Sequence, residues 1–500
     1  MNSFRRVNRM ALGEARTHVR FFVILNIILG TACLLQVTQA IGNRAYNNVS
    51  ETALWLFILG GAIAPTCVIS VFRELHNPQQ SDVVYSLPMS AKERYASRIL
   101  TVFYLQLLPV IVWSGIATAV TVLLFNYAPR EVDSWWVWYN TRPQEALQMF
   151  FLYVTSVLFL ETVTVICAIC CGRRAEMRYF TYIAAISISA APLMIRTRLM
   201  SEMGGQVTKP GIIYFLWSFS ALGDYVDTSI SIWRVLLVTV SSTLISLGVI
   251  VAMFFFYRKR DAGTAGKPVV SRIFFELVIL LGLVTYYTLF LFEGSPETVV
   301  AVALIIYVVI HLVTFRDILS GRKVAWWLGK FTATTVLFLF IVFVAYMTDG
   351  FGSIHYIPSR NLDGARILVS GDGYMTGYAG GEAYRRSWMR DYNDVEYMDS
   401  KEITDAEVRK VVEICQKYAA SGKKSMKGFY DKLWGTESYY GFLRESDRNE
   451  AFEVKIWLPG KPEDAEAVMD QQFYLTYGQA LQLVKELEET GILNIRRFWK

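Results

Sequence analysis

Apolar residues along this chain come in long runs, and each run ends in a polar or basic stretch. A helix of about 20 residues spans about 30 Å, the thickness of the hydrocarbon core of a bilayer. Runs such as 235–256 lack the polar face that a buried helix of a soluble protein would show. We therefore predict membrane-spanning helices at 20–42, 52–72, 99–126, 146–171, 177–195, 230–256, 273–292, 298–315 and 325–347.

Basic residues are distributed unevenly between the two sides of these predicted spans. If the N-terminus is cytoplasmic, the inner segments hold 21 Lys and Arg residues and the outer loops hold 6. The positive-inside rule favours this direction. Nine spans place the C-terminal region outside the cell. That region would be cytoplasmic if one of the two short spans, 177–195 or 298–315, were absent.

The pattern changes after residue 347, where the long apolar runs stop. Residues 348–500 carry 21 basic and 25 acidic residues, whereas the rest of the chain carries 28 and 18. The overall basic excess is thus a signal of membrane orientation, and no clustered basic face indicates nucleic-acid binding. Alternating and β-branched residues predict strands at 365–370 and 451–458. Helices are predicted at 404–420 and 476–489.

Both helices predicted in this region begin at a capping box, in which Thr404 pairs with Glu407 and Thr476 with Gln479. Their inward faces are expected to be Val408, Val411, Val412 and Cys415 in the first helix, and Ala480, Leu481, Val484 and Leu487 in the second. The tail has no second cysteine for a disulfide, so it must be stabilised by its own core.

The N-terminal segment has an amphipathic pattern, with apolar residues at three- and four-residue steps among arginines. This predicts a surface helix on anionic lipid, although a plain basic flank of the first span fits as well. The chain as a whole is predicted to be an all-α polytopic membrane protein with a C-terminal α+β soluble domain. Its parts are a surface helix at 1–19, a six-helix core at 20–265, three additional transmembrane helices at 266–347 and an extracytoplasmic domain at 348–500.

Two short motifs lie beside the predicted spans. The first, SDVVYSLPMSAKER at 81–94, places a helix-breaking Leu-Pro between an acidic residue and a basic, helix-forming run. The second, YRKRDAG at 257–263, closes the sixth span. Both resemble permease subunits of ABC-2 type transporters, in which a D…SLP(hydrophobic)S…R pattern follows the second helix. In these permeases the sixth helix also ends in an aromatic residue, a basic pair, an acid and Gly. The resemblance covers residues 1–265.

The resemblance implies a membrane subunit of a Gram-positive bacterial ABC exporter, driven by a separate ATP-binding subunit and paired with an identical or related permease. The loop that contacts the ATPase would then contain Asp82, Tyr85, Ser86, Leu87, Pro88, Lys92 and Arg94. The substrate stays open. The three further spans and the tail are additions to the minimal family pattern.

No motif indicates that the chain itself does chemistry. Residues 263–268 lack the spacing and hydroxyl of a phosphate-binding loop, and Pro268 removes a backbone donor. The triplet Cys167, Cys170 and Cys171 is more typical of small residues in a membrane helix than of a metal or redox site, because no nearby His or Cys completes four ligands. We expect no cofactor and no enzymatic activity.

A charge in the middle of a membrane helix is the remaining functional pointer. Glu161 lies near the centre of the fourth span, where a charged side chain is costly. It could line a substrate route, pair with a basic group or hydrogen-bond with Thr162 or Thr164. Glu276 is expected to pair with Arg272, four residues earlier.

Two other function classes are compatible with the same pattern. A membrane-anchored sensor or scaffold would use the tail, which differs in composition from the rest of the chain, to bind a ligand or an envelope partner. A membrane enzyme would need several acids or histidines at one depth, and the sequence offers few.

Overall fold

The computed structural model describes most of the helical part of the chain and the core of the tail. The described residues are 2–42, 63–86, 88–127, 143–194, 232–291, 295–315, 321–348, 357, 361–371, 374–379, 403–420, 449–457 and 469–493. The chain divides into two compact units. The first comprises 1–191, 211–282 and 309–317, and the second comprises 192–210, 283–308 and 318–500.

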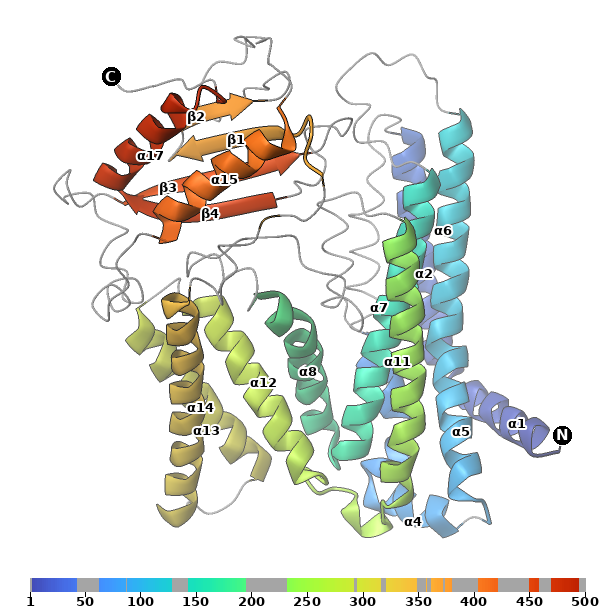
Figure 1. The fold of residues 1–500 in the computed structure, drawn as a ribbon. Coiled ribbons are helices and arrows are strands. Elements are labelled where there is room, and N and C mark those ends of the chain that lie inside the picture. The colour runs from blue at the N-terminus through green and yellow to red at the C-terminus, as the bar shows by residue number, and fades with distance from the viewer. Residues whose placement is uncertain are drawn as a thin grey trace. The chain divides into compact units, whose positions relative to one another are not determined.

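Long helices occupy the predicted spans (Figure 1). They are α2 (Val19–Gly42), α5 (Ala91–Val102), α6 (Leu108–Tyr127), α7 (Pro143–Cys170), α8 (Arg174–Met194), α11 (Ile232–Arg258), α12 (Arg272–Phe290), α13 (Pro296–Phe315) and α14 (Gly321–Met347). A π-helical turn, η2 (Phe103–Leu107), joins α5 to α6. The predicted span 52–72 is helical from residue 63, and its first part lies outside the described residues.

Six helices among the described residues are long and apolar enough to cross a membrane, and their ranges are Ala91–Val120, Phe150–Cys170, Val235–Arg258, Arg272–Phe290, Pro296–Phe315 and Gly321–Met347. A bent pair, Phe4–Thr17 with Val19–Leu34, makes a seventh if it counts as one span. The chain is thus largely helical with several membrane-compatible helices, and the number nine stays a prediction.

In the first unit, α2 packs on α6, and α7 packs on both α6 and α11. The indole N–H of Trp113 donates to the Asn26 side chain across α2 and α6 at 2.9 Å. A Cβ at Gly30 would lie 3.1 Å from the Trp113 ring, so the two helices approach closely because this residue has no side chain. Their shared core is apolar and consists of Leu25, Leu29, Leu107, Val110, Tyr153 and Val157.

The expected ion pair of α12 is present, with Arg272 Nε 4.0 Å from Glu276 Oε1. The same helix packs its aromatic residues against α8, where the rings of Phe180 and Phe275 meet edge to face at 5.4 Å. In the second unit, Tyr287 is hydrogen-bonded to Thr335 of α14 at 2.8 Å. The helices after residue 266 are therefore held by buried aromatic and hydroxyl contacts.

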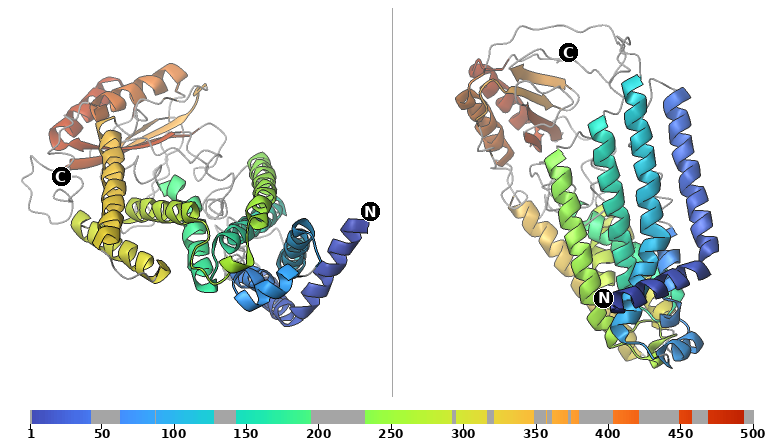
Figure 2. Two further views of the ribbon diagram at one scale, coloured as in Figure 1. Left: turned by 90° about the horizontal axis from the view of Figure 1, so that it is seen from below. Right: turned by 90° about the vertical axis from the view of Figure 1, so that its right-hand side faces the viewer.

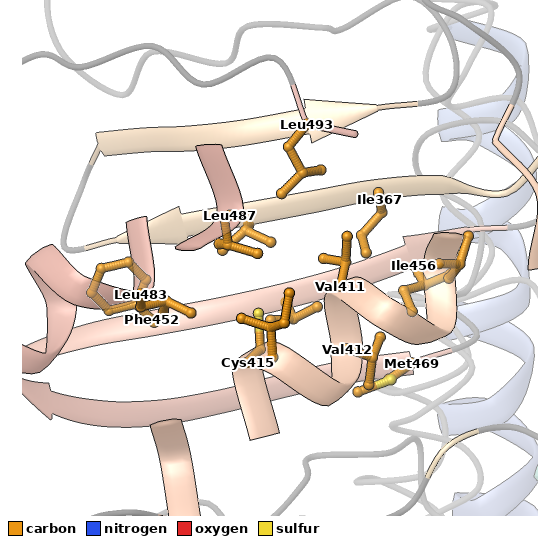
Figure 3. Close-up of a cluster of buried hydrophobic side chains, with 14 of the residues drawn as sticks. Ile367, Val411, Val412, Cys415, Phe452, Ile456, Met469, Leu483, Leu487 and Leu493 are labelled. Carbon is orange, nitrogen blue, oxygen red and sulfur yellow. The ribbon is translucent and has the colours of Figure 1, made fainter. Parts of the chain in front are cut away.

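The tail forms a four-stranded antiparallel sheet in the order β2-β1-β3-β4. Its elements are β1 (Arg366–Gly371), β2 (Tyr374–Ala379), α15 (Asp405–Ala420), β3 (Asn449–Trp457), β4 (Met469–Thr476) and α17 (Tyr477–Glu489). Both helices cover one face of the sheet (Figures 1 and 3). Alternate residues of the strands, such as Phe452, Val454 and Ile456, point into the buried core beneath them.

The strands predicted at 365–370 and 451–458 and both helices of the tail are confirmed. Thr404 and Glu407 form the expected reciprocal hydrogen bonds, and the capping box of α17 is also present. One inward residue was predicted wrongly. Leu481 is 44% exposed, and Leu483 is fully buried instead. The face of α17 toward the sheet therefore consists of residues 480, 483, 484 and 487.

Candidate functional site

The motif at 81–94 folds into a short helix, α4 (Pro78–Ser86), followed by the start of α5. Asn77 caps α4, because its side chain accepts from the Gln79 amide at 3.1 Å. The helix ends at Ser86, close to Pro88, and the residue that precedes a proline disfavours helical geometry. Ser90 then caps α5 in a reciprocal box with Glu93.

The residues predicted to contact an ATPase divide into two groups. Asp82, Ser86, Pro88 and Lys92 are exposed, and so is the neighbouring Val83, at 62%. We call these five residues the exposed α4–α5 surface. These side chains are accessible to a partner. Leu87, also predicted to belong here, lies outside the described residues.

Tyr85 and Arg94 point inward instead. The Arg94 guanidinium lies 4.5 Å from the centre of the Tyr85 ring, and its Nη2 donates to the Met89 carbonyl at 3.3 Å. Arg94 is only 6% exposed. The pair therefore holds the end of α4 against the start of α5.

Beneath this surface, Arg98 of α5 joins two acidic residues from other elements. Its Nε donates to Glu74 Oε1 at 3.1 Å, and its Nη1 pairs with Glu14 Oε1. Glu74 belongs to the single turn η1 (Arg73–Leu75) that leads into α4, and Glu14 belongs to α1 (Asn2–Thr17). Arg98 thus connects the surface helix, the turn before α4 and the third predicted span.

Arg260 makes a second connection from beyond the end of α11. Its guanidinium donates to the Ala168 and Ile169 carbonyls of α7 at 2.9 and 2.6 Å, and to the Leu75 carbonyl at 2.6 Å. The last carbonyls of a helix lack partners within the helix, and a buried cation satisfies them. Arg260 is 4% exposed, so these bonds are shielded from water.

We define Glu14, Glu74, Arg94, Arg98 and Arg260 as the buried charge cluster, in which Glu14 is partly buried and the other four are buried. Burial raises the pKa of Glu74 to about 7, although the neighbouring Arg73, Arg94 and Arg260 lower it in part. Burial also lowers the pKa of His76 to about 3, assisted by Arg260, so this ring is neutral near pH 7. Guanidinium groups therefore carry the positive charge of the cluster.

The linker after α11 folds back onto the turn between α7 and α8. The Gly266 amide donates to the Gly172 carbonyl at 2.8 Å, and Arg173 Nε donates to the Gly266 carbonyl at 2.7 Å. A Cβ at Gly172 would overlap the carbonyl oxygens of Thr264 and Lys267, so this contact requires glycine. The two glycines in residues 263–268 suggest a flexible linker, but the segment is held to the turn after α7 by these hydrogen bonds.

The N-terminal surface helix is confirmed as a helix, and it bends by 75° from α2 (Figure 2). It lies against α5 and η2. Tyr104 donates to the Asn8 side chain at 2.8 Å, and the Thr101 hydroxyl donates to the Ala11 carbonyl at 3.3 Å. Arg5, Arg9 and Arg16 stay exposed. The helix is therefore fixed on one face and presents arginines on another.

The residues that carry the buried charge cluster were not singled out from the sequence, except for Arg94. Glu74, Arg98 and Arg260 looked like ordinary charges flanking apolar runs. The one sequence feature that could have pointed to the cluster was an acidic residue, Glu74, just after the apolar run at 52–72. Among the described residues, no group of three or more His, Cys, Asp and Glu side chains could hold a metal. Glu161 lies apart from this cluster, deep within α7.

Comparison of the chain with protein-family models, with curated proteins and with solved structures finds no match.

Proposed function

We propose that this chain is the transmembrane permease subunit of an ABC exporter in the cell membrane, driven by a separate ATP-binding subunit. The observation that carries the proposal is that an exposed helix surface is fixed to the buried ends of the membrane helices. The exposed α4–α5 surface offers a partner the apolar Val83 between Asp82 and Lys92. The resemblance at 81–94 and 257–263 names the partner as an ATPase.

The buried charge cluster gives this surface a mechanical connection. Movement of α4 reaches α5 through Tyr85 and Arg94, and reaches α1 through Arg98. It reaches α7 and α11 through Arg260. Closure of the ATPase on ATP would push the exposed α4–α5 surface, tilt these helices together and open a route between two permease chains toward the outside. Two chains, identical or related, would enclose that route.

In this proposal the N-terminus and the exposed α4–α5 surface are cytoplasmic and the tail is extracellular. The charge distribution of the loops supports this direction. The arginines of α1 would then face the anionic inner leaflet. Membrane lipid and the ATP-binding subunit are the partners expected on the cytoplasmic side.

Cross-linking in the native membrane tests the proposal directly. The six native cysteines are buried, so Ser86→Cys places one exposed thiol on the α4–α5 surface. With a reagent that joins a maleimide to a photoreactive benzophenone, which inserts into C–H bonds of any neighbouring chain, we expect Ser86→Cys to link to a polypeptide that binds ATP, and Lys485→Cys on the exposed side of α17 to link to none that does. Val83→Arg in the Ser86→Cys background should abolish the link, because it places a charge where an apolar contact is proposed. Absence of any ATP-binding product at residue 86 contradicts the proposal.

A second candidate function, a membrane-anchored sensor or scaffold, is favoured by one observation. The tail has its own sheet, two helices and a continuous apolar core, as an independent binding domain would. If Lys485→Cys links to an envelope protein while Ser86→Cys links to no ATPase, this second function replaces the first. If both link, the chain is a transporter with an outer sensing or lid domain.

A further inference from the structure

The exposed side of the surface helix α1 carries a row of arginines. Val7 and Ala11 are buried on the side of the helix that packs on the protein. Arg5, Arg9 and Arg16 are exposed. At about 100° per residue, these three positions lie within about 40° of one another and on the side of the helix opposite the buried pair. We call these three residues the arginine row.

The contacts of α1 with α5 and η2 show which edge of α1 lies deeper in the membrane. Arg6 Nη1 lies 3.8 Å from Glu93 Oε1 in the first turn of α5, which is the cytoplasmic end of that helix in the proposed topology. The Tyr104 hydroxyl, further along the same span, donates to Asn8 Oδ1 at 2.8 Å. Residue 8 therefore lies on the deeper edge of α1, and residue 6 lies on the cytoplasmic edge.

Apolar side chains extend along the deeper edge. Phe4 and Leu12 lie one helical turn before and after Asn8, so they share its side of the helix. They are 70% and 45% exposed. When these two side chains reach the hydrocarbon, the arginine row beside them lies at the depth of the lipid headgroups. A Cβ at Gly13, next to the row, would meet no atom within 4 Å, so this side of the helix is open.

No described acid neutralises the arginine row. The ion pairs described for α1 join Arg6 to Glu93 and Glu14 to Arg98, and neither involves the row. Guanidinium groups beside exposed apolar side chains at the membrane surface match an anionic phospholipid. The lipid phosphate accepts hydrogen bonds from arginine, and the acyl chains cover the apolar edge. An acidic protein segment would lack the second match.

Glu14 connects this helix to the turn before α4. Its carboxylate pairs with Arg98, which also donates to Glu74 Oε1 at 3.1 Å. Glu74 belongs to η1, which leads into α4. Arg98 is 9% exposed and Glu74 is fully buried, so water screens these charges little. Because a buried charge that loses its partner is costly, the position of α1 is coupled to the position of η1.

We propose that anionic phospholipid bound along α1 regulates the exposed α4–α5 surface. Headgroup phosphates bind the arginine row and hold α1 against α5, and the contacts of Arg98 with Glu14 and Glu74 transmit this position to η1 and α4. Without anionic lipid, α1 is held less tightly and the turn before α4 opens more often. The inference rests on the proposed function, because it takes this surface as the partner's site and its side of the membrane as cytoplasmic.

Hydrogen exchange of the unmutated, full-length chain in nanodiscs tests the proposal. The exchange is read by the mass of peptides that cover residues 4–17 and 73–86. We compare nanodiscs of phosphatidylcholine with nanodiscs of equal parts phosphatidylcholine and phosphatidylglycerol. Both segments should exchange about tenfold or more slowly in the anionic membrane. Raised salt concentration should remove the difference, because the headgroup charges are then screened.

Variants separate lipid binding from its transmission. The combined change of the arginine row to glutamine should abolish the response of both segments to phosphatidylglycerol. Glu14→Gln keeps the row and loses the pair with Arg98, so residues 4–17 should still respond and residues 73–86 should not. The matched control removes three exposed basic residues from other helices, namely Arg258→Gln, Arg322→Gln and Lys323→Gln. It should respond like the wild type.

Equal exchange of residues 4–17 in the two membranes overturns the inference and leaves the arginine row to an acidic protein partner. A response that does not reach residues 73–86, or one that survives there in Glu14→Gln, overturns it as well. If both segments respond while Ser86→Cys links to no ATP-binding polypeptide, the lipid-dependent element stands and the transporter function fails. If that link forms and neither segment responds, only the regulation by lipid fails.

Discussion

Single side chains account for much of the organisation at the end of the membrane helices. Arg260 donates to the carbonyls of residues 75, 168 and 169, which lie up to 185 positions away from it in the chain. It thus caps the ends of two helices, α7 and η1. Because these carbonyls are buried, their other potential partner, water, is excluded, and the loss of this guanidinium cannot be compensated locally.

The first prediction concerns this residue. Arg260→Ala leaves buried carbonyl groups without donors, and we expect the free energy of unfolding to fall by at least about 2 kcal/mol. The measurement is the thermal unfolding midpoint of the purified full-length chain in one detergent. Arg258→Ala is the matched control, because Arg258 is exposed and lies two residues earlier. Equal midpoints for the two variants would show that the carbonyl contacts are not important for stability.

A second prediction follows from the raised pKa of Glu74, which is about 7 in the folded chain against 4.5 ordinarily. The folded state holds this proton more tightly than the unfolded state does. The resulting stabilisation is complete below about pH 4.5 and is lost as the pH rises through 7. The thermal unfolding midpoint should therefore decrease as the pH is raised from 5.5 to 8. Glu74→Gln should make this dependence of the midpoint on pH less steep.

The control for this pH dependence is Glu297→Gln, an exposed acid in the first turn of α13. It should retain the wild-type slope. The charged groups around Glu74 are Arg73, Arg94, Arg98 and Arg260. A Glu74→Gln variant with the full wild-type slope would assign the pH dependence to another residue.

At the scale of elements, hydropathy and capping signals predicted most of the helices. Apolar runs of membrane length locate α7, α11, α12 and α13 to within about one turn, because hydrophobic length is a local property of the sequence. The two capping boxes of the tail were also predicted, since they depend on residues three positions apart.

What could not be predicted depends on contacts between distant segments. The strand β4 was missed because Asp470, Gln471 and Gln472 interrupt its apolar pattern, and it is specified by pairing with β3. The inward direction of Arg94 depends on Tyr85 and on the packing of η1. Oε1 of Glu161 has no hydrogen-bond partner among the described residues, and this depends on how the helices pack and cannot be seen in the sequence of one helix.

The corrected face of α17 gives a third prediction. Leu483→Ala creates a cavity beneath the sheet and should cost about 2–5 kcal/mol, whereas Leu481→Ala on the exposed side should change stability by about 0.5 kcal/mol or less. Cys415, the only cysteine of the tail, is fully buried in the same core and reports on its opening. Maleimide modification of Cys415, read by peptide mass in the full chain, should accelerate about tenfold or more in Leu483→Ala. Matching rates in the two variants would contradict the assigned face.

At the scale of the whole molecule, the division of the chain differs from the one that composition suggests. The sequence changes character at residue 347, yet the first compact unit includes the beginning of α12 and the end of α13. Tyr179 of α8 is hydrogen-bonded to Thr314 of α13 at 2.8 Å, and Gly282 of α12 lies against Ile183. The beginning of α12 and the end of α13 are thus joined to α8 by buried polar and close-packed contacts, so removal of residues after 266 should not leave an intact six-helix protein.

The side of the membrane on which the tail lies depends on whether the number of spans is odd. The basic residues alternate in a way that requires all nine, including the helices now defined at Arg174–Met194 and Pro296–Phe315. If all nine cross, trypsin added to intact cells without their outer wall should cleave the tail and spare the N-terminal arginines. Immunoblots with tags at each end measure this, and lysis before digestion gives the fully accessible control.

If the tail is cleaved only after lysis, one of the nine predicted spans does not cross the membrane. The tail then lies in the cytoplasm, on the same side of the membrane as the exposed α4–α5 surface. This location would also turn the proposed sensing of an extracellular ligand into the sensing of a cytoplasmic one, while the connection from that surface to the helices through Arg98 and Arg260 would be unchanged.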